Sequence, residues 1–377
     1  MQTNPLKESF SVLVPDGESG FSLFAAHCLS YFPNVKIHVL SSKHWSPIRF
    51  SRHCHSYTFE PAKDASAHLD AIAQLVSKHR IDVLLPTDTK SIYFALANRK
   101  ALEKFVALAP LPDPKAFEIA NNKWLLSQFL EQNQIPGPPS ILVDYSNEFE
   151  AKLKDLEFPV LLKPMTSRDG DGIERFDTPS DLMRHLDQQQ PDQIRGRFIV
   201  QGFLSGSDVD LNFLSRDGEA LALTIQQAII PNTKEYGAAG AIKFIKNEKF
   251  SAVAKKLIAG LHWSGYANVD TICDSYDNLR IVDINARFWG SVRGSLAAGV
   301  SFPYFACLAA LNIPFPMPNY ELIRYFHPKT AMREVISNVV GKSREHNITF
   351  RESGLGFFLT DPLGEVVRIY EQEFLGV

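Results

Sequence analysis

Residues 280–291 read RIVDINARFWGS, a stretch that combines the apolar residues of a strand with three regularly spaced polar ones. Successive side chains of a strand point to opposite faces, so Asp283, Asn285 and Arg287 share one face. The opposite face is apolar and can pack on a core. Alternation of this kind is typical of a half-exposed antiparallel strand with its polar side in water. The neighbouring sequence supports a second interpretation, in which the polar face binds a ligand.

The segment before this strand predicts its pairing partner. Residues 265–274 read GYANVDTICD, and the turn-rich DSYDN at 274–278 joins the two segments, which together predict a β-hairpin. A hairpin that folds symmetrically about this turn places Asp270 opposite Asp283, and like charges directly opposite each other are unfavourable. Because a divalent cation would remove this conflict, and Mg²⁺ prefers oxygen ligands together with substrate phosphates, we expect Asp270, Asp283 and Asn285 to hold Mg²⁺.

The composition is that of an ordinary globular protein. The chain has 377 residues, 45% hydrophobic and 21% charged, and at roughly 150 residues per domain this predicts two or three domains. The net charge of −3 gives no reason to expect nucleic acid as a partner, and no apolar run reaches the roughly 18 residues of a membrane span. Four scattered cysteines and a polar N-terminus without a signal peptide predict a cytoplasmic protein.

Strands alternate with helical segments over residues 1–112, which predicts a Rossmann-like parallel sheet. Gly17 and Gly20 follow the first strand, but the G-x-G-x-x-G fingerprint is incomplete, which argues against a dinucleotide site. One helix is predicted over 113–134, where IPGPPS at 135–140 stops it. Further strands are predicted at 159–164, 197–204, 209–215 and 220–230, and C-terminal helices near 329–341 and 361–374.

The stretch LLKPMTSRDGDGI at 161–173 predicts a phosphate site. Lys163 ends a strand, and the glycine-rich loop that follows can close its backbone N–H groups on phosphate oxygens. The spacing is not that of a P-loop, and a plain Asp-Gly hairpin turn explains the loop equally well. A carboxylate pair whose metal ion needs phosphate ligands favours the phosphate interpretation.

The stretch IVQGFLSGSDVD at 199–210 leads from an apolar strand into a glycine-containing turn. A linker between two sheets at this point could offer backbone donors and acceptors to the edge of a purine, and Asp208 could bind ribose hydroxyls. Taken alone, the stretch is nonspecific.

In this order, these stretches resemble the ATP-grasp superfamily, most of all its carboxylate–amine ligase and carbamoyl-phosphate-synthase-like branch. The resemblance covers most of the chain and is most specific at D-I-N-A-R, residues 283–287. It implies an α/β and α+β fold with a two-lobed ATP-grasp core. The implied parts are a Rossmann-like pre-ATP-grasp domain at 1–112, an ATP-grasp domain at 113–315 with a small lobe at about 120–200 and a large lobe at about 201–315, and a C-terminal segment at 316–377 that packs on this core.

The resemblance also implies roles for single residues. The implied ATP-binding residues are Lys123, Lys163, Ser167, Arg168, Gly170, Gly172, Gln201, Phe203, Leu204 and Asp208. Asp270, Asp283 and Asn285 would hold two Mg²⁺ ions, for which Mn²⁺ is expected to substitute. Arg287 and Lys163 would be catalytic, with Arg287 gripping an acyl phosphate. The chain departs from the superfamily in having Asp at both metal positions, where Glu usually occupies at least one, and Gly202 where many relatives have Glu.

The implied reaction is ATP-dependent ligation of a small-molecule carboxylate to an amine. The carboxylate attacks the γ-phosphate, the amine then attacks the acyl phosphate, and an amide, ADP and phosphate result. One alternative is carboxyphosphate chemistry on bicarbonate, as in carbamoyl-phosphate synthase or biotin carboxylase, and another is an ATP-binding regulator without catalysis. A dinucleotide oxidoreductase is a further alternative. The resemblance suggests a homodimer, and the sequence names neither substrate.

Further polar residues are candidates for binding the substrates. Open α/β sheets bind ligands at the carboxyl ends of their strands, and two of the candidates follow predicted strands. Another follows a Gly-Ala run at 237–241, and two lie just after the strand that opened this section. The candidates are Asp16, Asp88, Lys243, Gly290 and Ser291.

Overall fold

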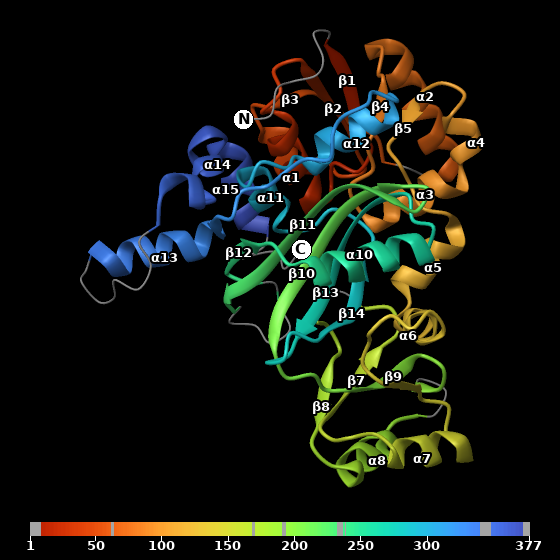
Figure 1. Cartoon of the computed structure of the whole chain (residues 1–377). Helices are drawn as coiled ribbons and strands as arrows, with labels where there is room; N and C mark the ends of the chain where they lie inside the picture. Colours follow the sequence, from red (N-terminus) through yellow and green to blue (C-terminus); the bar gives the residue numbers. More distant parts are fainter. Residues whose placement is uncertain are drawn as a thin grey trace.

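The structure is a computed structural model that describes residues 9–61, 64–167, 170–190, 194–231, 237, 239–339 and 348–371. Its described residues form three β-sheets, one parallel and two antiparallel (Figure 1). In the view of Figure 1, the six-stranded sheet lies between the other two. This arrangement confirms the predicted mixed α/β and α+β fold.

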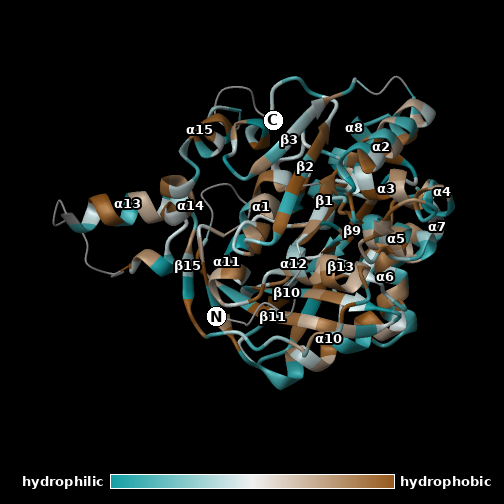
Figure 2. Ribbon diagram, turned by 90° about the horizontal axis from the view of Figure 1, so that it is seen from above, coloured by the Kyte–Doolittle hydropathy of each residue, from teal (hydrophilic) through white to brown (hydrophobic). Residues whose placement is uncertain are grey.

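The first sheet is parallel, with strand order β3-β2-β1-β4-β5. Its central strand β1 is buried along its whole length, as expected for a strand covered on both faces. β2 is hydrophobic over much of its length (Figure 2). The elements are β1 (Phe10–Val14), α1 (Gly20–Leu29), β2 (Val35–Ser41), the 3₁₀-helix η1 (Pro47–Phe50), β3 (Cys54–Phe59), α2 (Ala65–His79), β4 (Val83–Leu84), α3 (Thr89–Ala97), α4 (Arg99–Leu102) and β5 (Ala107–Leu108). The parallel sheet predicted from the alternation of strands and helices is thereby confirmed.

The helix predicted over 113–134 is two helices, so this prediction was wrong in its continuity. They are α5 (Pro114–Asn121) and α6 (Lys123–Gln132). Asn122 stands between them with an extended backbone, φ −126° and ψ 112°. Its side-chain oxygen accepts hydrogen bonds from the backbone N–H groups of Trp124 and Leu125, at 3.0 and 3.1 Å. This cap starts a new helix and places Lys123 in its first turn.

The four-stranded sheet has the order β6-β9-β7-β8, and its strands pair antiparallel. It has a hydrophobic cluster of its own, which includes Leu162, Leu182 and Val200. Its elements are β6 (Ser140–Leu142), α7 (Asn147–Lys154), β7 (Val160–Pro164), β8 (Glu174–Phe176), α8 (Pro179–Gln188) and β9 (Phe198–Gly202).

The six-stranded sheet has the order β14-β13-β10-β11-β12-β15 and is antiparallel throughout. The long strands β10 and β11 form its centre, with α10 packed on β10 and β11 and α12 packed on β10 and β13. Its elements are β10 (Ser207–Arg216), β11 (Glu219–Ile230), β12 (Ala241–Ile245), α10 (Glu248–Gly260), β13 (Gly265–Cys273), β14 (Leu279–Asn285), α11 (Val292–Ala297), α12 (Phe302–Ala310) and β15 (Arg324–Phe326).

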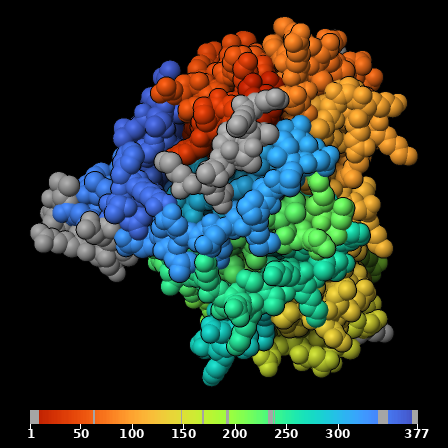
Figure 3. All heavy atoms as spheres, turned by 45° about the horizontal axis from the view of Figure 1, so that its top comes forward, coloured from red at the N-terminus to blue at the C-terminus, as the bar shows by residue number. Residues whose placement is uncertain are grey.

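The C-terminal helices return to the first sheet. They are α13 (Pro328–Val339), α14 (Leu355–Thr360) and α15 (Pro362–Tyr370), with the 3₁₀-helix η2 (Phe350–Glu352) before α14. Figure 3 shows this C-terminal part against the N-terminal part of the chain, and α15 packs on η1. No helix in the described part of the chain combines the length and apolar character needed to cross a bilayer.

Buried charged side chains join α15 and the residue before it to α1 and α11. His27 Nε2 lies 2.9 Å from Asp361 Oδ2, and the backbone N–H of Arg52 donates to the other oxygen of Asp361 at 3.0 Å. Arg293 donates to Glu365, which also accepts from Arg368 Nε at 3.0 Å. Because each buried charge has a partner of opposite sign or a hydrogen-bond donor, the cluster holds the two ends of the described chain together.

Candidate active site

The predicted hairpin is present, and its register places Asp270 directly opposite Asp283. Nearer the turn the register of the two strands differs by one residue, and Thr271 is opposite Ile281. The shift between these pairs leaves Val282 as the extra residue of a β-bulge. Without this bulge Asp270 would face Val282, so the bulge is what brings the two carboxylates together.

The carboxylate pair is part of a row that crosses four strands. Asp270 is also opposite Asp210 on β10, and Asp210 is opposite Gln226 on β11. Gln226 Nε2 donates to Asp210 Oδ2 at 2.5 Å and to Ser291 Oγ at 2.7 Å. We call Gln226, Asp210, Asp270 and Asp283 the acidic row. Partners across an antiparallel pair share a face, so the acidic row lies on one face of the sheet.

A second row of hydrogen-bonded amides runs beside the acidic row. Asn212 donates to Thr224 at 3.4 Å, Asn268 to Asn212 at 2.9 Å, and Asn285 to Asn268 at 2.9 Å. Asn285 Nδ2 also lies 3.0 Å from Asp270 Oδ2. These bonds fix the side chain of Asn285 beside the carboxylate pair.

Sequence reasoning missed Asp210 and Gln226. The sequence held a signal for Asp210, because Val-Asp-Leu-Asn at 209–212 repeats the pattern of Val-Asp-Ile-Asn at 282–285. Gln226 had no such signal, since its place in the row depends on the pairing of β10 with β11. Asp208, which the resemblance assigned to ribose, lies opposite Ile272 and is exposed.

The acidic row concentrates negative charge in a partly buried place. Burial raises the pKa of Asp270 well above its usual value, and the neighbouring Asp210 and Asp283 raise it further. Burial likewise raises the pKa of Asp210 to about 6, although its hydrogen bond from Gln226 opposes the shift. Both shifts mean that the charged form of these carboxyl groups is disfavoured where they lie, and a bound cation would oppose the shifts.

The donor set fits Mg²⁺ when phosphate completes the shell. Among the described residues, no three His, Cys, Asp or Glu side chains are grouped so as to hold a metal ion by themselves. Asp270 and Asp283 offer hard oxygen ligands opposite each other. The Asn285 amide turns Nδ2 toward Asp270 and its oxygen toward Arg287, so that oxygen would join the set after rotation of the amide. Mg²⁺ is usually held by one or two carboxylates together with phosphates and water, and this set matches that pattern.

Two buried lysines contribute positive charge beside the acidic row. Lys123, at the start of α6, places Nζ 2.9 Å from Asp283 Oδ2 and 3.3 Å from the carbonyl oxygen of Ser167. Lys163, on β7, donates to Gln201 Oε1 at 2.7 Å. Burial lowers the pKa of Lys163 to about 8; the charge of Lys123 lowers it further, whereas Asp283 and Asp270 oppose the shift. Lys123 on α6 and Lys163 on β7 of the four-stranded sheet thus lie beside the carboxylates of the six-stranded sheet, as the sequence predicted.

The predicted glycine loop follows Lys163 directly. Gly170 and Gly172 have positive φ angles of 77° and 72°, and a Cβ on Gly172 would lie 2.9 Å from Pro164 Cγ. Both the backbone conformation and the close approach therefore require glycine at 172. Arg168, a predicted ATP ligand, lies outside the described residues.

A cavity of about 600 Å³ adjoins Lys123. Lys123 and Gln201 line it, with α6, the 135–140 segment and β14 forming its walls. The residues that line it are Lys123, Leu126, Ser127, Leu130, Glu131, Ile135, Pro136, Gly137, Pro138, Pro139, Ser140, Gln201, Arg280, Ile281 and Val282. Of the other residues predicted for the nucleotide, Phe203, Leu204 and Asp208 do not line this cavity, and Phe203 instead packs under the Arg175 guanidinium, 4.6 Å from its ring.

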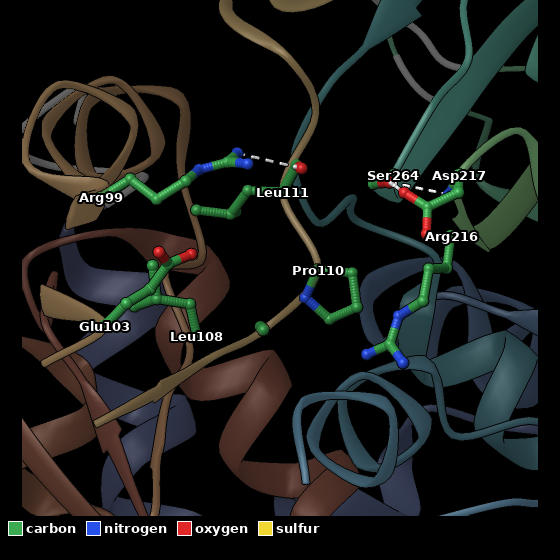
Figure 4. A pocket seen from close by; sticks show the side chains of 9 residues that line it. Arg99, Glu103, Leu108, Pro110, Leu111, Arg216, Asp217 and Ser264 are labelled. Carbon is green, nitrogen blue, oxygen red and sulfur yellow. Dashed lines mark hydrogen bonds between the residues drawn. The ribbon is translucent and has the colours of Figure 1, made fainter. Parts of the chain in front are cut away.

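A second cavity of about 170 Å³ lies away from the acidic row, between the first sheet and the β10–β11 turn. In Figure 4, Arg99 reaches the carbonyl oxygen of Leu111, at 3.1 Å, and Ser264 contacts Asp217. None of its lining residues was predicted for the site, and its charged groups of both signs bond to nearby protein atoms. We assign it no role.

Arg287 lies where β14 meets the first sheet. Its Nη2 donates to Asn285 Oδ1 at 3.0 Å, its Nε lies 4.0 Å from Asp88 Oδ1, and its guanidinium stacks 4.4 Å from the ring of Phe21. Asp88 N–H donates to Asp16 Oδ2 at 2.8 Å, so the predicted candidates Asp16, Asp88 and Arg287 lie together. Sequence reasoning gave no role to Phe21.

The remaining candidates divide into two groups. Ser291 joins the acidic row through Gln226, and a Cβ on the preceding Gly290 would meet no atom within 4 Å. Lys243 is paired with Gln227, the neighbour of Gln226, so its side chain leaves the sheet on the opposite face from the acidic row. Lys243, a predicted substrate residue, therefore lies on the other side of the sheet from Asp270 and Asp283.

Residues 120–291 match the family model described as the ATP-grasp domain. The protein contains an ATP-grasp domain. The match covers the glycine loop, the acidic row and Arg287, and it confirms the resemblance drawn from the sequence. The ATP-grasp domain is thus the part of the chain that carries both lysines and all the candidate metal ligands.

Curated relatives are distant and much longer than the aligned segments. The chain is 25% identical over 166 residues to the ATP-grasp enzyme fsqD of Aspergillus fumigatus, covering 44% of this chain and 27% of that protein. It is 24% identical over 164 residues to a D-alanine–D-alanine ligase of Hydrogenovibrio crunogenus, covering 40% of this chain and 50% of that protein. The aligned part therefore spans half or less of these relatives.

Solved structures share the fold over most of the chain. N5-carboxyaminoimidazole synthetase from Staphylococcus aureus, complexed with ADP, has a TM-score of 0.68 at 17% identity, covering 90% of this chain and 88% of that one. The biotin carboxylase domain of Hydrogenobacter thermophilus 2-oxoglutarate carboxylase, in complex with MgADP and bicarbonate, has a TM-score of 0.64 at 16% identity, with coverages of 84% and 73%. An L-amino acid ligase from Bacillus licheniformis has a TM-score of 0.57 at 18% identity, with coverages of 82% and 75%. At these identities the likeness shows the fold.

The charge imbalance of the acidic row predicts that Asp270→Asn stabilises the metal-free protein. The folded state raises the pKa of Asp270, so above its ordinary pKa the carboxyl group costs stability that an amide does not. We expect the free energy of unfolding in urea, at pH 7.5 with a chelator present, to rise by at least about 1 kcal/mol.

Asp283→Asn is the matched control for this experiment. It removes a charge from the same row but also removes the partner of the buried Lys123, so no gain in stability is expected. If Asp270→Asn lost as much stability as Asp283→Asn, the result would contradict a charge imbalance in the acidic row.

Proposed function

We propose that this protein is an ADP-forming ATP-dependent ligase that joins a small-molecule carboxylate to an amine through an acyl phosphate. The observation that carries the proposal is the acidic row facing Lys123 and Lys163, because opposed carboxylates and lysines are what a magnesium-bound triphosphate needs. The ATP-grasp domain match, the sequence similarity to a D-alanine–D-alanine ligase and the fold shared with an L-amino acid ligase support it.

The lysines and the glycine loop would hold the phosphates. Lys123 would exchange its bond with Asp283 for a phosphate oxygen, and Lys163 would turn from Gln201 toward the same group. Ser167, Gly170 and Gly172 would offer backbone N–H groups from the loop. The base and ribose would be held by Gln201, Phe203, Leu204 and Asp208.

Asp270, Asp283 and Asn285 would hold two Mg²⁺ ions, with Mn²⁺ as a substitute. Bound Mg²⁺ supplies neutralisation of phosphate charge during transfer. In the protein itself, the bulge at Val282 keeps the two carboxylates opposed, and Asn285 is oriented by Asn268. The acidic row is thereby arranged before a ligand arrives.

Arg287 would stabilise the acyl phosphate and its tetrahedral adduct. Its guanidinium is fixed by Asn285, by the carbonyl oxygen of Phe288 and by stacking on Phe21, so it needs no rearrangement to meet an oxyanion. Gly290 and Ser291 follow it and would add backbone donors. Closure of the 165–173 loop would exclude the water that hydrolyses an acyl phosphate.

Carboxyphosphate formation from bicarbonate is the second candidate, since the same fold occurs in a biotin carboxylase domain with MgADP and bicarbonate. The two activities differ in the substrate that stimulates ATP cleavage. We further propose a cytoplasmic homodimer and the domain division at residues 112 and 315, on the family resemblance and the order of the sheets along the chain.

ADP and phosphate release should depend on a carboxylate together with an amine. Purified protein with ATP and Mg²⁺ would be given pooled small carboxylic acids, pooled amino acids, both pools, or bicarbonate. We expect Asp283→Asn and Arg287→Ala to lower kcat/KM for the stimulating pool by about 100-fold or more, as for loss of a charge-stabilising group. Stimulation by bicarbonate alone would favour the second candidate.

Asp274→Asn is the control for this assay. Asp274 lies in the turn of the same hairpin, where it accepts from Tyr276 and Asn278, and it is not in the acidic row. Its substitution should change the rate by less than about twofold, as for most surface changes. If no substrate stimulates release and MgATP does not bind, the ligase proposal fails.

MgATP affinity should fall as pH rises through 8. Burial lowers the pKa of Lys163 to about 8, and a phosphate beside it would raise that pKa, so binding should take up a proton above pH 8. From pH 7 to pH 9 the dissociation constant should rise about tenfold. Isothermal titration in buffers of different ionisation enthalpy measures both quantities, and Lys163→Met should remove the proton uptake. Equal affinity across this range in the unsubstituted protein would place Lys163 away from the phosphates.

A further inference from the structure

Asp16 lies at the carboxyl end of β1 and uses only one of its two oxygens. Oδ2 accepts from the backbone N–H groups of Thr87 and Asp88, at 2.9 and 2.8 Å, and from the hydroxyls of Thr87 and Ser91, at 3.0 and 2.5 Å. Three of these donors come from Thr87 and Asp88 in the turn between β4 and α3, and the fourth is Ser91 in the first turn of α3. They hold the carboxyl group firmly in one orientation.

The other oxygen, Oδ1, is buried and accepts no hydrogen bond. Asp16 as a whole is 5% exposed. A buried carboxylate oxygen without a donor is unfavourable, so an oxygen kept in that condition indicates a missing donor. Burial raises the pKa of Asp16 to about 7 and nearby Asp88 raises it further, which agrees with a shortage of positive charge at this point.

The turn that holds Asp16 also adjoins the place proposed for the acyl phosphate. Asp88 Oδ1 lies 4.0 Å from Arg287 Nε, and the backbone N–H of Phe288 donates to Thr87 O at 3.3 Å. A group bound between Asp16 and Asp88 would therefore lie next to the guanidinium that faces the acyl phosphate. This is where the second substrate of a ligase must be placed.

We propose that Asp16 and Asp88 bind the ammonium group of the amine substrate, which is therefore a primary amine that is cationic in solution. This inference rests on the proposed function and assigns one of its two substrates to a site. Asp16 Oδ1 supplies an acceptor already fixed by the four bonds to Oδ2. Asp88, whose carboxylate caps α3 by accepting from the Thr89 N–H and lies 4.0 Å from Arg287 Nε, adds a second negative group near this acceptor.

Hydroxylamine separates amine binding from acyl-phosphate formation. It is uncharged at neutral pH and traps an acyl phosphate as a hydroxamate, so it does not need an ammonium site. Protein, MgATP and the pooled carboxylic acids would be supplied with hydroxylamine, and ammonium chloride together with the twenty common L-amino acids would then be added as competing amines. Bound amines lower the hydroxamate yield.

Asp16→Asn is the informative variant. Its amide oxygen can keep the bonds from Thr87, Asp88 and Ser91, while its NH₂ group replaces Oδ1 and repels an ammonium ion. We expect the amine concentration that halves the hydroxamate yield to rise by at least about tenfold, as for loss of a hydrogen bond to a charged group. Asp88→Asn should shift it in the same direction.

Ser91→Ala is the structural control. It removes one donor to Oδ2 and leaves Oδ1 in place. Because the Ser91 bond lowers the pKa of Asp16, the half-effective amine concentration should rise slightly, and by much less than in Asp16→Asn. If the half-effective amine concentration rose equally in Ser91→Ala and Asp16→Asn, Asp16 would only stabilise the turn, and the assignment would be overturned. The assignment would also be overturned if amines competed equally well in Asp16→Asn and in the unsubstituted protein. It would be overturned as well if no amine of the pool competed with hydroxylamine. Absence of hydroxamate and of ADP release in the unsubstituted protein would instead refute the ligase itself, and amine binding with it.

Discussion

Asp270 and Asp283 lie opposite each other on two paired strands, so the register of the central sheet fixes the backbone positions of both. The same sheet adds Asp210 beside them. A sheet normally avoids like charges in such positions. Here a positive charge from outside the sheet offsets the repulsion between the carboxylates. It comes from Lys123, which pairs with Asp283. The geometry of the nucleotide site follows from this arrangement.

The register of the hairpin could be predicted from its sequence, but for an incomplete reason. Symmetry about the turn gives the pairing of Asp270 with Asp283, yet the strands next to the turn pair one residue out of that register. The bulge at Val282 restores it. Alternation reveals which residues share a face within a strand, whereas a bulge depends on local backbone geometry that alternation does not encode.

Other features depended on contacts between distant segments. Gln226 and Phe21 come to the site through strand pairing and sheet packing, so no local pattern marks them. The side of the sheet on which Lys243 lies depends on the register of β12, which no local sequence pattern encodes. The helix break at Asn122 was missed, although asparagine is favoured at N-caps over helix interiors, because helix-forming sequence continues on both sides of it. By contrast, the alternation of strands and helices before residue 112 was enough to predict a parallel sheet.

The buried charges that join α15 to α1 have a consequence for the order of events during synthesis. His27 and Asp361 are 334 residues apart, so the first helix of the chain is translated long before its last partner exists. Until then His27 lacks its carboxylate partner, and the surface of α1 that α15 and its neighbours cover stays open to water. Contacts of such long range form late and slow folding. The first sheet can pair its strands early, but the growing chain must keep that surface from aggregating until residues 361–368 emerge.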